Sequence, residues 1–360
     1  MKILHVITSL RTGGAEKLMV DLLPRLRQRG HDVDLLLFDG TDTPFRREAE
    51  QAGIKVFDLG IGGSVYSPLR LLKLIPFFKK YDIIHTHNTA SQYFVAIASC
   101  FKRVKLVTTE HGGSNRRRAI RGFKIIDKWM YRHYDNVICI AEKTQKNLLN
   151  YLGKSLHGMV TINNGVDIAR YADAMPSKEL DSIAPGSRKI IMVAGFRWEK
   201  DQDTLIKSLK ELPQRFHLFL VGDGVRRPEL ESVVREENLA TRVHFLGLRS
   251  DVPSLLHAAD YVVMSSHFEG LSLSSVEGMS VGKPFLASDV DGLREVANGA
   301  GILFPHSDSK AIANEIMALE NSPEEYRSVA DACRQRASQF DISKMVDGYA
   351  KIYESLDETD

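Results

Sequence analysis

The stretch from Tyr261 to Val290 constrains the fold of this chain most, because it runs through strand, loop, helix and strand in close succession. An apolar run predicts a buried strand over Tyr261 to Ser266, and a second short strand, Phe285 to Ser288, follows Gly282 and Pro284. Parallel strands need such a crossover connection, usually a helix. The stretch therefore predicts a parallel α/β fold.

The loop and helix inside this stretch predict an anion site flanked by carboxylates. Ser272, Ser274 and Ser275 are typical of a helix start, where the first amide groups and the helix dipole favour a phosphate. Glu269 in the loop and Glu277 about one turn into the helix can both face the carboxyl end of the strand. A carboxylate beside a phosphate is repelled unless it accepts hydrogen bonds, for example from sugar hydroxyls. We therefore expect a nucleotide sugar here; a capped helix with solvated glutamates is the alternative.

This stretch resembles the Glu-x7-Glu signature of the retaining glycosyltransferases of family 4. The similarity includes Phe268 to Leu273, Val276 to Met279 and Gly282 to Pro284, and it continues over nearly the whole chain. The resemblance implies an α/β protein of the GT-B fold, with two Rossmann-like domains facing each other across a deep cleft. It also implies a C-terminal helix that crosses back to the first domain.

Length and composition are consistent with two domains and with a reduced, cytoplasmic protein. A chain of 360 residues fits two domains of ordinary size. No apolar run approaches the ~18 residues that a membrane span needs, and the first run ends at Arg11, so it predicts a strand and not a signal peptide. Three scattered cysteines lack the spacing of metal ligands.

Strand and helix patterns alternate along the chain, and they predict the domain boundaries. Residues 1–167, with about 340–360, form the N-terminal Rossmann-like domain; 168–188 is a linker rich in turn residues; 189–339 form the C-terminal donor domain. The asymmetry of charge follows these limits, because residues 1–167 carry +11 and residues 168–360 carry −9. In the helix expected over Pro68 to Lys80, Pro76 predicts a kink.

Two features of the N-terminal domain are candidates for ligand contact. Gly13 and Gly14 join the first strand to a helix, an arrangement that lets backbone amides approach a phosphate. His111 follows the strand Lys105 to Thr109, at the carboxyl end where open α/β sheets bind ligands. The resemblance assigns the glycines to the donor pyrophosphate and acceptor, and His111 to the donor's sugar ring. A tight turn and a half-buried structural histidine are the alternatives.

The segment from Asn115 to His133 is basic and apolar at helical spacing. Such a helix can bind an anionic membrane surface, a partner or nucleic acid, and in a glycosyltransferase we expect the membrane, where lipid-linked sugar acceptors lie. A solvated basic face over a buried apolar one is the alternative. The expected basic contacts are Arg116, Arg117, Arg118, Arg121, Lys124 and Lys128.

The second domain opens with the strand Lys189 to Ala194 and a turn that holds two cations, Arg197 and Lys200. The resemblance assigns Lys200 to the donor phosphates. Gly195 stands where the family has an arginine, and we expect Arg197 to substitute for it. Two cations here would neutralise the diphosphate as the glycosidic bond breaks.

The resemblance implies a retaining, metal-independent glycosyltransferase of cell-surface polysaccharide synthesis. It would move a sugar from a nucleotide diphosphate sugar, with UDP-sugars favoured over GDP-mannose, to a glycan or polyprenyl-linked acceptor at the inner membrane face. Catalytic roles fall to Glu269, His111, Lys200 and Arg197, and the donor also meets Gly270, Leu271, Ser272, Leu273 and Glu277. No aspartate pair resembling a metal-binding motif lies beside the site, so no metal and no other cofactor are expected.

Two other classes share this pattern. A nucleotide-sugar 2-epimerase of the same fold would change the donor without an acceptor, and a phosphorylase would need a pyridoxal lysine that the sequence does not identify. A non-catalytic nucleotide-sugar binding protein would tolerate the loss of cations, and Gly195 is the feature that favours it.

Overall fold

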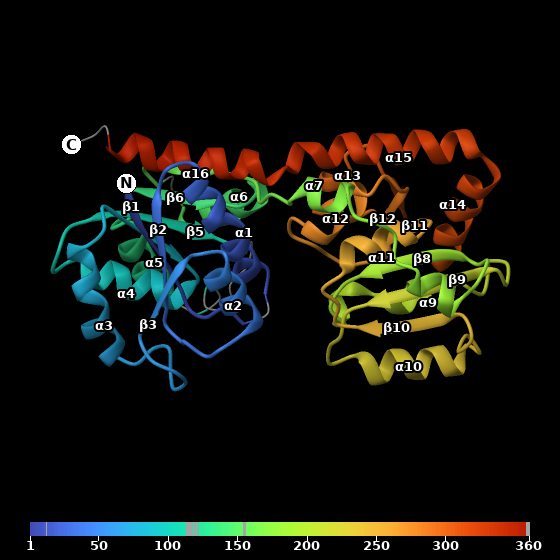
Figure 1. Cartoon of the computed structure of the whole chain (residues 1–360), viewed down its shortest axis with the longest axis horizontal. Coiled ribbons are helices and arrows are strands. Elements are labelled where there is room, and N and C mark those ends of the chain that lie inside the picture. The colour runs from blue at the N-terminus through green and yellow to red at the C-terminus, as the bar shows by residue number, and fades with distance from the viewer. Residues whose placement is uncertain (12, 113–117, 119, 121, 154–155, 358–360) are drawn as a thin grey trace. The chain divides into compact units, whose positions relative to one another are not determined.

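The computed structural model describes residues 1–11, 13–112, 118, 120, 122–153 and 156–357 (Figure 1). The chain divides into two compact units. Unit 1 holds Met1–Asn164 and Ile342–Asp360, and unit 2 holds Gly165–Asp341. Each unit is built around one parallel sheet.

Unit 1 has a seven-stranded parallel sheet in the order β3-β2-β1-β4-β5-β6-β7. Its strands are β1 (Lys2–Ile7), β2 (Asp32–Leu37), β3 (Lys55–Asp58), β4 (Ile83–His87), β5 (Lys105–Glu110), β6 (Asn136–Cys139) and β7 (Met159–Thr161). The chain moves outward from β1 to β3 and then returns to β4 on the other side of β1. Ligands of open α/β sheets bind at such a reversal, outside the carboxyl ends of the strands.

The helices of unit 1 cover both faces of the sheet (Figure 1). They are α1 (Gly14–Gln28), α2 (Pro44–Gln51), α3 (Leu69–Leu74), the 3₁₀ turn η1 (Ile75–Lys79), α4 (Thr89–Ser99), α5 (Phe123–Tyr131), α6 (Glu142–Leu152) and α16 (Ile342–Asp357). The α-helix stops at Leu74 and continues as a 3₁₀ turn that contains Pro76, where the kink is predicted. Proline has no N–H and its ring collides with the preceding turn, which explains the change.

Strand β1 shows how the unit is packed, because its side chains alternate between two cores. Ile3 and Ile7 belong to the core that includes α1 and α16, whereas Leu4 and Val6 belong to the core on the opposite face. A parallel sheet buried on both faces reads as a continuous apolar run, as this one does. The polar exception is His5, which points to the same face as Ile3 and is fully buried.

Unit 2 has a six-stranded parallel sheet in the order β10-β9-β8-β11-β12-β13. Its strands are β8 (Arg188–Val193), β9 (Phe216–Val221), β10 (Val243–Gly247), β11 (Tyr261–Met264), β12 (Phe285–Ser288) and β13 (Ile302–Phe304). Its helices are α7 (Ile168–Ala172), α8 (Glu179–Ile183), η3 (Trp198–Lys200), α9 (Gln202–Ser208), α10 (Arg227–Glu236), α11 (Val252–Ala258), α12 (Leu273–Ser280), α13 (Leu293–Ala297), α14 (Ser309–Asn321), α15 (Pro323–Ala337) and η4 (Ser338–Phe340). The segment 168–188, expected as a linker, holds α7 and α8 and lies within unit 2.

Helix α12 packs against strand β11 at unusually short range, and a glycine permits it. A Cβ atom at Gly278 would lie 2.6 Å from the Val262 Cγ1 atom, closer than side chains tolerate. This contact fixes where the first turn of α12 lies relative to the end of β11. None of the helices in the described part of the chain combines the length and the hydropathy that a membrane-spanning segment requires.

Candidate functional site

The loop after β11 holds Glu269 in a nearly buried ion pair. The Lys200 ammonium contacts the Glu269 carboxylate, and the hydroxyl of Ser266 donates to Glu269 Oε1 at 2.8 Å. Only 12% and 11% of the Lys200 and Glu269 side chains are exposed. A carboxylate so little hydrated needs paired partners, and here it has two. The structure thus brings together two of the predicted site residues.

The loops after β8 and β11 are joined through their backbones as well. The amide of His267 donates to the carbonyl of Glu199 at 2.9 Å, and the Ser265 hydroxyl donates to the carbonyl of Asp201 at 2.8 Å. Lys200 is the last residue of η3, which follows β8 directly. These bonds hold the lysine and the glutamate in one place without relying on the ion pair alone.

Arg197 lies beside the position that Gly195 leaves open. A Cβ atom at Gly195 would lie 3.6 Å from Arg197 Nε, so the guanidinium occupies the space next to this glycine. The Arg197 side chain is 62% exposed, and its Nε is 3.2 Å from Glu199 Oε1. An exposed guanidinium held by one flexible partner can turn toward an anion.

The first turn of α12 presents free amide groups. Ser272 is the N-cap, as the sequence predicts, but its hydroxyl accepts a hydrogen bond from the Ser275 hydroxyl at 2.8 Å and makes no cap bond to the backbone. Among the described residues, the amides of Leu273 and Ser274 have no hydrogen-bond partner. Glu277 lies in the same helix and is half-buried. Unpaired amides at a helix start form a site for an anion.

Gly270 and Leu271 complete the loop that precedes this helix. The carbonyl of Gly270 is covered by the loop after β12, because a Cβ at Gly292 would lie 2.1 Å from that oxygen. The space that a Cβ at Gly270 itself would enter is open. The backbone of this loop is therefore held from one side and accessible on the other.

In unit 1, His111 ends a chain of buried hydrogen bonds that begins on α16. The members in order are His111, His87, His5, Tyr353, His85, Thr109 and Tyr349. The distances between successive side-chain atoms are 2.9, 2.9, 3.3, 2.6, 2.8 and 3.1 Å. Burial lowers the pKa of His111 to about 4 and that of His5 to about 3, with the charge of His31 adding to the shift of His5. These imidazoles are neutral at pH 7, and the Nδ1 atom of His111 has no partner among the described residues.

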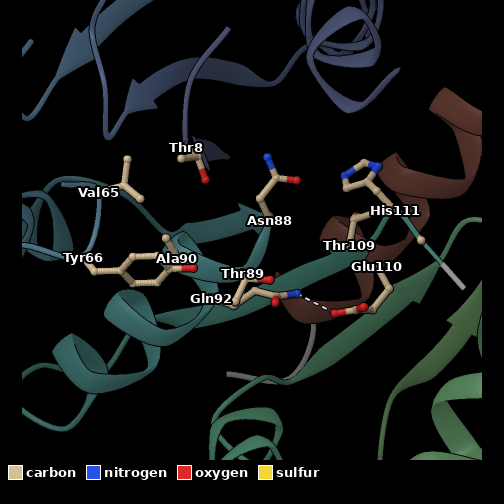
Figure 2. Close-up of a pocket in the computed structure, with 11 residues that line it drawn as sticks. Thr8, Val65, Tyr66, Asn88, Thr89, Ala90, Gln92, Thr109, Glu110 and His111 are labelled. Carbon is tan, nitrogen blue, oxygen red and sulfur yellow. Dashed lines mark hydrogen bonds between the residues drawn. The ribbon is translucent and has the colours of Figure 1, made fainter. Parts of the chain in front are cut away.

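His111 lines a cavity of about 350 Å³ at the carboxyl ends of β1, β4 and β5 (Figure 2). Thr8 follows β1, Asn88 follows β4 and His111 follows β5, so the cavity lies where the strand order reverses. Gln92 donates to Glu110 at 2.6 Å along one wall, as Figure 2 shows. The lining is mostly polar, which suits a hydrated ligand such as a sugar.

Gly13 is the N-cap and Gly14 the first residue of α1, and neither lines this cavity. The Glu16 side chain folds back over Gly13, because a Cβ there would lie 2.2 Å from Glu16 Oε2. Burial raises the pKa of the Glu16 carboxyl, which also bonds to its own backbone amide and to Asn88. A carboxylate thus lies at the helix start where the sequence predicts a phosphate.

The predicted basic membrane surface is wrong at Arg118. Its guanidinium donates to Glu110 Oε2 at 2.8 Å and to the Tyr131 hydroxyl at 3.4 Å, and both charged side chains are 9% exposed. Arg118 therefore neutralises a buried carboxylate and is not available to a surface. Arg116, Arg117 and Arg121 lie outside the described residues. Lys124 is exposed and Lys128 half-buried on α5.

The structure also brings together polar residues that the sequence analysis did not combine. Asp201, His267 and His306 gather at the loops after β8, β11 and β13, and their ligand atoms lie within 4.8 Å of one another. His5, His85 and Tyr353 join His111 through the sheet and α16. Residues so far apart in the chain give no local signal that they meet. The histidines at 85 and 87, in an otherwise apolar strand, are a sequence feature that could have indicated the buried chain of hydrogen bonds.

Sequence models of known protein families match both units. A sequence model described as "Glycosyltransferase Family 4" matches residues 12–170, and one described as "Glycosyl transferases group 1" matches residues 178–336. The N-acetyl-alpha-D-glucosaminyl L-malate synthase of Bacillus anthracis is 25% identical, over 95% of this chain and 93% of that protein. The UDP-Gal:alpha-D-GlcNAc-diphosphoundecaprenol alpha-1,3-galactosyltransferase of Escherichia coli is 25% identical, over 81% of this chain and 78% of that protein.

The solved structures agree with the sequence comparison. HepE of Anabaena, in a crystal structure with UDP-glucose, superimposes with a TM-score of 0.85 at 26% identity, over 99% of this chain and 100% of that one. The two parallel sheets, the returning C-terminal helix and the signature loop with its ion pair are all present in one chain. This chain belongs to the family 4 glycosyltransferases, which have the GT-B fold.

Proposed function

We propose that the protein is a retaining transferase that moves a sugar from a nucleotide diphosphate sugar to a glycan or polyprenyl-linked acceptor. The observation that carries the proposal is the group formed by Lys200, Glu269 and the free amides of Leu273 and Ser274 in unit 2. A cation and amide donors suit a diphosphate, while a fixed carboxylate suits sugar hydroxyls. We favour a UDP-sugar, because HepE is solved with UDP-glucose and the relative from Escherichia coli is named for UDP-Gal.

In the proposed reaction the bond between the anomeric carbon and the diphosphate oxygen breaks, and negative charge grows on that oxygen. Lys200, Arg197 and the amides of residues 270–273 stabilise it. The acceptor hydroxyl attacks from the same face and gives its proton to the leaving phosphate, so the configuration is retained without a protein nucleophile. Stabilisation by fixed donors of this kind contributes roughly 10²–10³ in rate per donor.

Glu277 binds the ribose, and Glu269 and His111 orient the transferred sugar. Because burial holds the pKa of His111 at about 4, the imidazole acts at pH 7 as a neutral hydrogen-bonding group and not as a cation. We also propose that no metal ion bridges the diphosphate, since Lys200 and Arg197 supply the positive charge. Turnover should then be independent of added Mg²⁺ or Mn²⁺.

Nucleotide-dependent thermal stability tests the donor class. UDP at a hundredfold its dissociation constant should stabilise the protein by about 2.7 kcal/mol, and GDP, ADP and CMP should do so less. Glu277→Ala should abolish the shift, because it removes the proposed ribose contact. Absence of a shift with every nucleotide would contradict a nucleotide-sugar function of any kind.

What happens to the donor nucleotide sugar distinguishes a transferase from a non-catalytic binding protein and from an epimerase. With an acceptor glycan, Lys200→Ala should lower kcat/KM by about a hundredfold or more, whereas Lys207→Ala, an exposed lysine on α9, should not. A non-catalytic binding protein, which Gly195 favours, would show no turnover in the wild type either. An epimerase would convert the donor when no acceptor is present.

We further propose that α5 lies on an anionic membrane surface. Ile125, Ile126 and Trp129 are 75%, 47% and 38% exposed on this helix, beside the exposed Lys124. Exposed apolar side chains next to lysine are typical of interfacial helices, and a lipid-linked acceptor would lie at such a surface.

Co-sedimentation with phosphatidylglycerol vesicles tests this surface. Ile125→Ser with Trp129→Ser should reduce binding, and changing Arg116, Arg117 and Arg121 to Ala should make the remaining binding less sensitive to salt. The matched control changes Leu69 and Leu72 of α3 to Ser, since these are 68% and 66% exposed in the same unit. If both double variants lost vesicle binding equally, α5 would not be the membrane-binding surface.

A further inference from the structure

Three loops of unit 2 direct ligand-type atoms at one point. His267 Nδ1 lies 2.6 Å from His306 Nε2 and 3.6 Å from Asp201 Oδ2. The hydroxyl of Ser307 is 3.2 Å from His306 Nε2 and 3.4 Å from Asp201 Oδ2. Two imidazoles and one carboxylate thus converge, with a hydroxyl beside them.

Hydrogen bonds satisfy this arrangement only in part. His267 Nδ1 faces both a carboxylate oxygen and a second ring nitrogen, but a ring nitrogen carries at most one proton and can satisfy only one of them. If the proton goes to His306 at 2.6 Å, the carboxylate at 3.6 Å is beyond hydrogen-bond distance, and the Asp201 Oδ2 atom is left with the Ser307 hydroxyl at 3.4 Å. A cation at the shared point would satisfy all three atoms at once.

The backbone at this point is held in an uncommon conformation. Asp201 has φ +47° and Ser307 has φ +58°, in the left-handed region that residues other than glycine rarely adopt. The cluster is nonetheless reachable, since the Asp201 and His267 side chains are 6% and 18% exposed and His306 is exposed.

We propose that Asp201, His267 and His306 form a site for a divalent transition metal, with Zn²⁺ as the best fit. Bonds of about 2.0–2.1 Å place two tetrahedral ligand nitrogens about 3.3 Å apart, so the His267–His306 pair opens by less than 1 Å. Two histidines and a carboxylate with an open position are a ligand set for zinc and its neighbours, whereas Mg²⁺ prefers oxygen ligands.

The metal would tie together the loops after β8, β11 and β13. Asp201 follows Lys200 directly, and His267 precedes Glu269 by two positions, so the ion would fix the backbone on which this pair is carried. The proposal does not depend on sugar transfer, because the ion is bound without any nucleotide.

Zinc titration of the untagged, metal-free full-length protein tests the proposal. One equivalent of Zn²⁺ should bind and raise Tm, and Co²⁺ in its place should give visible absorption of four-coordinate intensity. Removing a group that only supports a metal ligand lowers metal affinity roughly 10–100-fold. Removing a ligand itself should cost no less, so His306→Ala and Asp201→Asn should each weaken zinc binding by at least about tenfold. Asp201→Asn keeps a residue that can cap α9 and tolerates the positive φ, so its effect reports the charge.

The control is another histidine pair in the same unit. His217 Nδ1 lies 3.0 Å from His244 Nε2 in a stacked pair, and His244→Gln should leave zinc affinity unchanged. Failure of the wild type to bind zinc would overturn the proposal. So would one equivalent whose affinity is the same in His306→Ala, Asp201→Asn and the wild type.

Discussion

At the scale of single residues, Gly292 decides how the signature loop is held, and Gly299 serves as a comparison. Gly292 has φ +85°, and a Cβ atom there would lie 2.1 Å from the carbonyl oxygen of Gly270 and 2.5 Å from that of Glu269. Gly299 has φ +79° but no atom within 4 Å of the corresponding position. The first glycine is required by packing and conformation together, and the second by conformation alone.

Replacing each glycine by alanine separates these two requirements. Gly299→Ala should lower the free energy of unfolding by about 1 kcal/mol, the cost of a side chain in the left-handed region. Gly292→Ala should cost at least about 2 kcal/mol more, because the obstacle is backbone and cannot rotate away. It should also weaken UDP binding, since the loop of Glu269 must move. Urea unfolding and calorimetric titration measure both, and equal costs in the two variants would show that the loop yields freely.

At the scale of elements, a single line of hydrogen-bonded side chains links strands β1, β4 and β5 with helix α16. Each of the six hydrogen bonds between His111 and Tyr349 needs one proton, and each of the seven side chains supplies one when neutral. If Tyr349 donates to Thr109, every bond is filled and the remaining proton lies on His111 Nδ1. That Nδ1–H then has no partner among the described residues, whereas the reverse order leaves two groups unpaired there, the buried Tyr349 proton and the His111 Nδ1 lone pair. A buried unpaired group costs about 1–3 kcal/mol, which favours the first order.

All four histidines of the line should therefore carry their proton on Nδ1, the less common form in water. Nitrogen-15 NMR of the imidazoles at pH 7 measures this directly. Tyr353→Phe should leave His85 and His111 in different or mixed forms, because the line is cut between them. Four histidines with the proton on Nε2 in the wild type would contradict the order.

The same histidines make stability depend on pH. The pKa values of His5 and His111 are 6.5 in the unfolded chain and about 3 and about 4 in the folded protein. At a pH between the folded and the unfolded pKa, the unfolded state therefore binds more protons. Stability is therefore complete above pH 6.5 and decreases as the pH falls toward 4, by roughly 1.4 kcal/mol per histidine and pH unit well below 6.5. Urea unfolding of unit 1 from pH 7 to pH 4 measures it. His5→Phe should reduce the slope, and an unchanged slope would mean that His5 is not the group responsible.

At the scale of the whole molecule, unit 1 is completed by the last helix of the chain. Helix α16 is the red helix that packs on the sheet of unit 1 (Figure 1). Its side chains Met345, Val346, Tyr349 and Tyr353 are buried in the core on one face of that sheet. The core of unit 2 contains no residue of α16. The first unit thus depends on a segment made after the second, whereas unit 2 is continuous.

Truncation before α16 should accordingly affect one unit only. A chain of residues 1–341 should lose the cooperative unfolding of unit 1, because a large apolar face and the line of histidines become exposed, and keep that of unit 2. Residues 165–341 alone should unfold at the same temperature as unit 2 in the full chain. Calorimetry resolves the two transitions. If the truncated chain retains both of them unchanged, the helix is not needed for unit 1.

The sequence by itself determined the local elements and the signature. The apolar patterns and the turn residues identified most of the strands and the break at Pro76. They also predicted helices over Lys310 to Glu320, Pro323 to Gln339 and Ile342 to Leu356, close to the observed α14, α15 and α16, because such elements depend on neighbours in the chain. The helices α4, α7 and α8 and the strand β13 were not anticipated. The resemblance assigned Lys200 and Glu269 to the donor site, but their ion pair was seen only in the structure.

Only the tertiary structure decided which distant side chains meet. Strand order placed His5, His85 and His87 beside one another and brought Tyr353 to them from the far end of the chain. It buried Arg118 against Glu110, where charge alone had indicated an exposed basic face. It also gathered Asp201, His267 and His306 from three loops. A sequence records what each residue prefers locally, but contacts across a sheet depend on which strands are neighbours, and the free energy of the whole fold determines that.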